Sequence, residues 1–473
     1  MSISIAADET AAARRDRAFL GHPAGLGWLA FSELWERFSY YGMTALLVLY
    51  LAHSLLTGSH SANVIGFGPF QAAVETLYGK AATPLGLASH IYALYTAFVY
   101  LTPLAGGWLA DRFLGRTAAV TTGALLMALG HFLMAFEASF LLALLCLLTG
   151  VGLFKGNIAS QVGDLYKSDD PRRANAFQIF LLSVQIAVIV SPLICGTLGE
   201  VYGWGWGFGA AGVGMLIGLL TYLFGRRNYP PEPVRQREIA ARPPLSGQDW
   251  TKIAVLMLLL PVMAASLCGN QQIGNAYPLW AETHFNLVFF GKTMPTSWLQ
   301  SVDAIFSTGT LLIVIAFWRW WETRWAEPDE LAKMTIGVAI SSLAPLALAA
   351  ASAIVAATHA KVGVSWAFAF ELLNDIGFAN VVPVGLALYS RAAPKGMTGL
   401  IIGIYYLHLF AGNLFTGWLG GLLDTMPATR FWLLHAGIMG TSAVVLLVAR
   451  LAFGRVLAPA YGAPDSEPAQ AAA

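Results

Sequence analysis

Long apolar stretches alternate with short polar ones along almost the whole chain. A helix needs about 20 apolar residues to cross the hydrocarbon core of a membrane, because each residue advances it by about 1.5 Å. A short surface helix is expected in the polar loop 55–86. We predict a membrane-spanning helix over each of twelve stretches: 27–54, 87–110, 117–136, 139–162, 175–197, 206–225, 251–282, 296–320, 330–357, 364–390, 396–423 and 430–453.

A polar, basic and proline-rich segment, RRNYPPEPVRQREIAARPPLSGQDW, separates the sixth stretch from the seventh. Proline-rich polar sequence of this kind is typical of an irregular tether. We therefore predict an all-α membrane protein that resembles the major facilitator fold, in which two six-helix bundles rock around a site near the bilayer midplane. The predicted divisions are a tail 1–26, a bundle 27–225, a linker 226–250, a bundle 251–453 and a tail 454–473.

The basic residues are distributed unevenly over the predicted loops. Of the 27 lysines and arginines, 21 fall on the side that carries both tails and the linker, and two lie within spans. Cytoplasmic loops carry such an excess of positive charge, so both termini are expected in the cytosol. The other four fall on the opposite side: Lys80, Lys292, Lys361 and Arg430.

Composition agrees with a membrane protein and excludes several other classes. Hydrophobic residues make up 57% of the chain and charged residues 11%, and the mean hydropathy is +0.63. The net charge of +1 gives no support to nucleic acid as a partner. The three cysteines lie in apolar runs, the histidines lack metal-ligand spacing, and no phosphate loop or nucleophile motif is present. We expect neither an enzyme nor a metal site.

The first predicted span carries ionisable groups at membrane depth, in the segment SELWERFSYYGM. Glu33 and Arg37 are four residues apart, as are Glu36 and Tyr40, so two adjacent stripes of the helix are polar. Such groups are costly in lipid unless they are paired or face water. One interpretation is a structural Glu33–Arg37 pair between helices. We favour a polar cavity, because three charges exceed what one structural pair needs.

The segment ELWERFSYYG resembles the ExxERFxYYG signature of the proton-dependent oligopeptide transporter family, the peptide branch of the major facilitator superfamily. Four further segments are similar to family segments in both halves: GGWLADRFLGR at 106–116, LFKGN at 153–157, PVGL at 383–386 and APKGMTGLIIGIYYL at 393–407. The glycines of the first of these favour close helix packing. The resemblance thus touches nearly the whole chain.

The resemblance implies roles for the matching positions. The proton-coupling cluster would consist of Glu33, Glu36, Arg37 and Lys155, and tyrosines would line the substrate cavity. A carboxylate beside a lysine or arginine gains or loses its proton as that cation moves, which couples protonation to conformation. The cytosolic gate would be latched by Asp111, Arg112 and Arg116.

Departures from the family pattern gather in the expected pocket. Thr44 stands where the family has the arginine thought to hold a peptide carboxylate, and Phe378 stands where it has the acid that receives the amine. In the seventh span the family's EQxGS reads QQIGN, so Gln271 replaces a glutamate. The predicted substrate-binding residues are Tyr40, Tyr41, Thr44, Tyr100, Gln185, Gln271, Asn275, Asp375, Phe378 and Tyr405.

Acidic residues reappear close to the lost ones. Asp303 lies in the eighth span, where we expect it to take over the proton-coupling role of the missing glutamate, and Asp375 lies one turn before Phe378. Structural alternatives stay open: Asp303 could pair with Lys155 or with a helix end. Asp375 could also have a purely structural role, since it lies beside Asn374 and four residues after Glu371. An added acid and a lost cation favour amines over substrates that depend on a free carboxylate.

We therefore predict a proton-coupled symporter that imports di- or tripeptides or, more narrowly, peptide-like or amine solutes by alternating access. It would use the proton gradient and no cofactor, work as a monomer in the plasma membrane (the inner membrane of a bacterium), and bind small molecules, protons and lipid. One alternative is an exporter or weakly coupled uniporter of a non-peptide solute. Another is a non-transporting nutrient sensor, for which the short tails leave little room.

Overall fold

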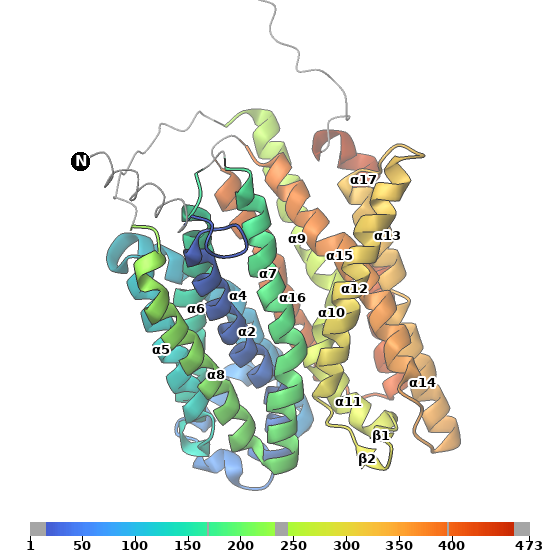
Figure 1. Ribbon diagram of the computed structural model, residues 1–473. Helices are drawn as coiled ribbons and strands as arrows, with labels where there is room; N and C mark the ends of the chain where they lie inside the picture. Colours follow the sequence, from blue (N-terminus) through green and yellow to red (C-terminus); the bar gives the residue numbers. More distant parts are fainter. Residues whose placement is uncertain (1–15, 168–169, 232–244, 395–396, 458–473) are drawn as a thin grey trace, which may run out of the picture.

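The computed structural model describes residues 16–167, 170–231, 245–394 and 397–457. Long helices form two groups that lie side by side, one from each half of the chain (Figure 1). The predicted division into two helical bundles agrees with this arrangement. Most of the predicted linker 226–250, the outer parts of both predicted tails and Lys395 lie outside the described residues.

The first bundle runs from α2 to α8, and its helices pack around one large apolar core. Helix α3 is the short surface helix expected in the loop after the first span. The elements are α2 (Ala24–Tyr50), η1 (Leu51–Leu55), η2 (His60–Asn63), α3 (Phe67–Tyr78), α4 (Pro84–Leu109), η3 (Ala110–Leu114), α5 (Arg116–Leu133), η4 (Glu137–Ser139), α6 (Phe140–Asp164), α7 (Arg172–Ser191), η5 (Pro192–Gly196), η6 (Leu198–Tyr202), α8 (Trp204–Gly225) and η7 (Arg226–Asn228).

The second bundle runs from α9 to α17 and contains a short antiparallel hairpin of two strands. Its helices enclose two apolar clusters. The elements are α9 (Gly247–Ser266), α10 (Cys268–Gln271), η8 (Gln272–Gly274), α11 (Ala276–His284), β1 (Val288–Phe289), β2 (Lys292–Thr293), α12 (Trp298–Glu322), α13 (Glu330–Ser341), α14 (Ala344–Thr358), α15 (Ser365–Ala392), α16 (Thr398–Gly420) and α17 (Ala428–Leu457).

Eleven helices within the described ranges are long and apolar enough to cross a membrane. The remaining predicted span, 117–136, corresponds to α5, which packs against α6 and α8. Threonine, glycine and histidine residues make α5 less apolar than its neighbours. The molecule is therefore a multi-pass membrane protein with helices at all twelve predicted positions.

Two of the predicted spans are not continuous helices. Span 251–282 breaks into α9, α10, η8 and α11, and Asn275 at the last break has φ −116° and ψ −100°. Just before it, a Cβ on Gly274 would lie 2.0 Å from the hydroxyl of Tyr92, so the chain approaches the first bundle closely here. Span 330–357 is interrupted between α13 and α14, where Pro345 lies in the first turn of α14.

The two ends of the described chain lie at the same end of the molecule, which we call the terminal end. The β1–β2 hairpin lies at the opposite end, which we call the hairpin end (Figure 1). This placement agrees with an even number of spans.

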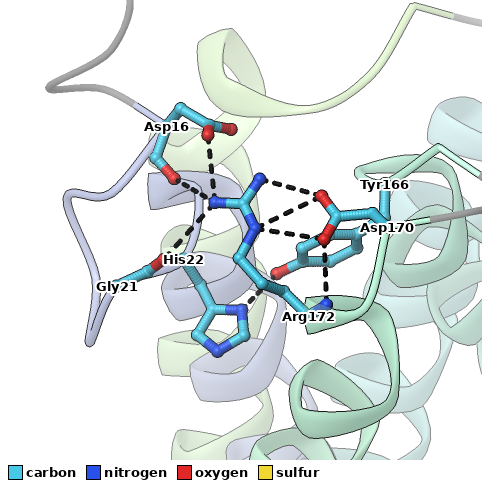
Figure 2. Close-up of polar contacts among 6 residues, drawn as sticks. All are labelled: Asp16, Gly21, His22, Tyr166, Asp170 and Arg172. Carbon is cyan, nitrogen blue, oxygen red and sulfur yellow. Dashed lines mark hydrogen bonds and ion pairs between the residues drawn. The ribbon is translucent and has the colours of Figure 1, made fainter.

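A polar cluster ties the start of the described chain to the start of α7 (Figure 2). The Arg172 guanidinium forms ion pairs with Asp170 at 2.8 Å and with Asp16 at 3.0 Å, and it donates to the Gly21 carbonyl. Hydrogen bonds from Arg172 lower the pKa of Asp170. His22 and the Tyr166 hydroxyl lie 2.9 Å apart beside this cluster. The segment before α2 is thus held against the terminal end of the first bundle.

Candidate functional site

A buried ionic cluster lies on α2. Arg37 Nε is 3.0 Å from Glu33 Oε1 and 2.5 Å from Glu36 Oε2. All three side chains are buried, and the Glu36 side chain is fully removed from solvent. Because Glu33 and Glu36 lie within one turn, a single guanidinium faces two carboxylates. One of the two acids is therefore left without a full charge partner from α2.

Lys155 on α6 completes this cluster. It lies within electrostatic range of Glu33, Glu36 and Arg37, and its Nζ is 5.1 Å from the centre of the Tyr100 ring. Arg37 in turn lies 5.5 Å from the centre of the Tyr40 ring. Two carboxylates and two cations thus form a nearly neutral group at membrane depth, bordered by tyrosines. The structure brings together four of the five residues predicted for proton coupling.

A polar pocket of about 150 Å³ lies between the two bundles. Five of the predicted substrate-binding residues line it, together with Asp303 from α12. Tyrosine rings supply apolar walls with a hydroxyl at the edge, which suits a small solute that has both polar and apolar parts. The predicted residues in the lining are Tyr40, Tyr41, Thr44, Tyr100 and Gln271.

Other predicted residues lie outside the lining of this pocket. The Gln185 amide donates to Thr308 Oγ1 at 2.6 Å, which links α7 to α12. Asn275 is fully buried at the break before α11. Phe378 packs against the apolar core of the second bundle. Tyr405 is fully buried in that core and donates its hydroxyl to the Val382 carbonyl, so here it supports helix packing.

Sequence reasoning missed several lining residues: Tyr92, Thr96, Val188, Asn270, Ile273, Gly274, Gln300 and Asn413. Asn270, Gln300 and Asn413 carried a usable signal, because uncharged amides at membrane depth also require a partner or a cavity. The apolar members carried none. Ile273 and Gly274 reach the pocket only because the helix is broken beside them.

Asp303 does not join the Lys155 cluster. Its nearest charged neighbours are Glu371 and Asp375 on α15, and one carboxylate oxygen from each of the three lies within 4.8 Å of the others. Lys155 interacts instead with the charges of α2. Asp375, predicted as a substrate-binding residue, is 1% exposed and belongs to this acidic group rather than to the pocket lining.

The three residues predicted to latch the cytosolic gate lie at the turn between α4 and α5. Arg116 forms an ion pair with Asp164 at the end of α6, within the first bundle. The Arg112 guanidinium lies 5.8 Å from the Trp108 ring centre and 5.7 Å from the Phe113 ring centre. Asp111 is exposed. The role of these residues in a gate stays a prediction.

Polar contacts between the bundles gather toward the hairpin end. Glu200 in η6 of the first bundle accepts backbone hydrogen bonds from Thr296 at 2.7 Å and Ser297 at 2.8 Å. These N–H groups precede α12, so the carboxylate also lies at a positively polarised helix N-terminus. Nearby, Trp298 donates to Thr197 at 2.9 Å, and His53 pairs with Glu282 at 2.7 Å. These contacts join the two bundles at the hairpin end, and we call the Glu200–Thr296–Ser297 contact the hairpin-end latch.

We expect Glu200→Ala to shift the molecule at least about tenfold toward a state in which the hairpin end is open. Each hydrogen bond to a charged group contributes about 1.5–3 kcal/mol, and 1.4 kcal/mol corresponds to a factor of ten. Electron–electron distances between spin labels at the exposed positions Ser59 and Phe290 would measure the opening, since the native cysteines are buried. In the control, Glu137→Ala removes an acid that pairs with His60 inside the first bundle. An unchanged distance distribution in Glu200→Ala would contradict the latch.

Two helical bundles around a polar pocket with buried charges define a membrane transporter of the major facilitator type. A family model described as the POT family matches residues 117–242 and 248–436. The chain therefore belongs to the POT family, as the sequence motifs predicted. The α2 cluster lies before the matched residues, so its role depends on the motif and on the geometry described above.

Similar proteins come from several bacteria. The chain is 28% identical to "Uncharacterized transporter YclF" of Bacillus subtilis, over 91% of this chain and 93% of that protein. It is 29% identical to "Peptide transporter YePEPT" of Yersinia enterocolitica, over 91% of this chain and 95% of that protein. A crystal structure of a peptide transporter POT in complex with sulfate has the same fold, with a TM-score of 0.80, 24% identity, and coverage of 93% of this chain and 96% of that one.

Proposed function

We propose that the protein is a proton-coupled symporter that imports a peptide-like or amine solute by alternating access. The observation that carries this proposal is the buried group of Glu33, Glu36, Arg37 and Lys155 beside the pocket between the bundles. Protonating one carboxylate changes the net charge of this group. It therefore changes the relative stability of conformations in which the members of the group lie apart. Similar proteins that are described as peptide transporters support a substrate of this class.

The proposed orientation places the terminal end on the cytosolic side of the plasma membrane, which in a bacterium is the inner membrane. Under this orientation the latch of Glu200, Thr296 and Ser297 closes the outer side. The state described here would then precede release of solute to the cytosol. Alternating access follows if breaking that latch allows the bundles to rock about the pocket.

The proposed narrowing to amines rests on the pocket's charges. Asp303 lines the pocket, while Thr44, in place of a cation, uses its hydroxyl to donate to the Tyr40 carbonyl at 3.0 Å. Thr44 therefore offers no charge to a substrate carboxylate. One crystal structure with the same fold, at a TM-score of 0.77 and 21% identity over 93% of this chain and 98% of that one, is of a POT family transporter in complex with 5-aminolevulinic acid.

Uptake by purified protein in liposomes under an inward proton gradient tests the proposal. A panel of dipeptides, polyamines and amine-bearing drugs competes with a labelled substrate. We expect the best amine to compete at a concentration at least about tenfold below that of dialanine, a difference of about 1.4 kcal/mol in binding. Blocking the amine by acetylation should remove the competition.

Strong uptake of dialanine would refute the narrowing to amines but not the transport function. Uptake that is the same with and without a pH gradient would refute proton coupling and favour a uniporter. A labelled solute that leaves loaded vesicles only when protons move inward would indicate an exporter.

A further inference from the structure

Three carboxylates from two helices meet inside the second bundle. Glu371 and Asp375 are four residues apart on α15 and so share one face, opposite Asp303 on α12. Glu371 is 0% exposed and Asp375 is 1% exposed. Asp303 is half-buried, and it alone of the three lines the pocket between the bundles. The group is thus a buried site with one member at the edge of the pocket.

No compensating cation is found for this group among the residues that the structure describes. Lysine and arginine are absent from the groups that interact with Asp303, Glu371 and Asp375. This differs from α2, where Arg37 faces both acids. Three ionised carboxylates so close together in a membrane repel one another and lose their hydration. Such a group must hold either protons or a positively charged ligand.

A fourth oxygen points into the same place. The Tyr277 hydroxyl is fully buried, makes no hydrogen bond that meets standard geometry within the described chain, and interacts with Glu371 and Asp303. Its ring stacks on Phe370, with ring centres 5.0 Å apart, which fixes its direction. Tyr277 is the second residue of α11, just after the break at Asn275. Discontinuous helices of this kind supply ion sites in transporters.

We propose that Asp303, Glu371 and Asp375, together with the Tyr277 hydroxyl, form a binding site for a hard metal cation. Three oxygens that lie within 4.8 Å of one another share a point no farther than 4.8/√3, or about 2.8 Å, from each. Hard cations take oxygen ligands, and calcium binds them at about 2.3–2.6 Å. A small inward adjustment of these side chains gives that distance. Carboxylates and hydroxyls are also the donors that such ions prefer.

Two other ligands fit the arrangement less well. A shared proton needs one close pair of oxygens, about 2.5–2.7 Å apart, and leaves the third carboxylate and the tyrosine unused. The ammonium group of a substrate would enter from the pocket, where it meets Asp303, but Glu371 and Asp375 do not line that pocket. A desolvated inorganic ion can use all four donors.

Thermal unfolding of the full chain in detergent tests the site without any transport measurement. Sodium, calcium and magnesium chlorides are compared with choline chloride at constant pH and ionic strength. We expect at least one metal ion to raise the Tm by about 2 °C or more at saturation, because a ligand that binds only the folded state stabilises it. Glu371→Gln and Asp375→Asn should each abolish this rise.

The matched control is Glu330→Gln, the same change at an acid that pairs with Arg391 elsewhere in the second bundle; it should keep the full rise. If Glu371→Gln does not fold, Asp303→Asn at the pocket edge is expected to weaken the response at least tenfold in cation concentration. A Tm that responds to no metal ion would overturn the proposal. So would a response that Glu371→Gln and Asp375→Asn leave intact, or stabilisation by acid pH alone, which would assign the group to protons.

Discussion

Glu36→Gln is expected to abolish accumulation of substrate under an inward proton gradient while preserving exchange of substrate across the membrane. The glutamine keeps the size of the side chain and resembles the protonated acid, but it cannot release a proton. The carboxylate that lies 2.5 Å from Arg37 Nε is thereby lost, and the cluster loses the acid that we expect to take up and release the proton. A symporter of one proton per solute accumulates its solute about tenfold per pH unit, and this factor should fall to one.

Two assays on one liposome preparation separate the effects. Gradient-driven uptake measures proton coupling. Counterflow between labelled and unlabelled substrate measures the movement of substrate across the membrane without a proton gradient. The control Glu75→Gln changes an acid on the surface helix α3 that accepts a hydrogen bond from Gln71, and it should behave like the unaltered protein. Concentrative uptake that persists in Glu36→Gln would contradict the assignment. If only Glu36→Gln removes coupling and Asp303→Asn leaves it unchanged, Asp303 has not taken over the role of the missing glutamate.

Hydrophobic length was enough to predict where the helices lie, because lipid leaves backbone groups no other way to be satisfied. The same criterion did not predict the break at Asn275, because apolar residues on both sides of the polar run GNQQIGN at 269–275 give 251–282 the length of one span. That break depends on contact with the other bundle, where Tyr92 approaches Gly274. Contacts between distant segments leave no trace in local hydropathy.

The candidate site, too, could be predicted only in part from the sequence. The α2 cluster could be predicted because its three members lie within five residues of one helix, and their spacing alone sets their proximity. The Asp303 group could not, since it depends on how α12 packs against α15. The sequence offered Lys155 as one partner for Asp303. The structure instead places Asp303 beside Glu371, a residue that sequence reasoning noted only as a neighbour of Asp375.

The close contact between α4 and α6 should respond strongly to a single added methyl group. A Cβ at Gly106 on α4 would lie 2.0 Å from the Gly152 carbonyl oxygen of α6, and no side-chain rotation can relieve a clash with backbone. We expect Gly106→Ala to force the two helices apart and to destabilise the protein by about 1–3 kcal/mol. Thermal unfolding in detergent and the yield of monodisperse protein would measure the loss.

The neighbouring glycine supplies the control, because a Cβ at Gly107 meets no atom within 4 Å. Gly107→Ala should change stability by no more than about 0.5 kcal/mol, or raise it slightly through the better helix propensity of alanine. Equal stability of the two variants would contradict the close contact between α4 and α6. The expected result is a large loss of stability in Gly106→Ala and none in Gly107→Ala. It would show that, of the two glycines that begin GGWLADRFLGR, Gly106 is needed for helix packing and Gly107 is not.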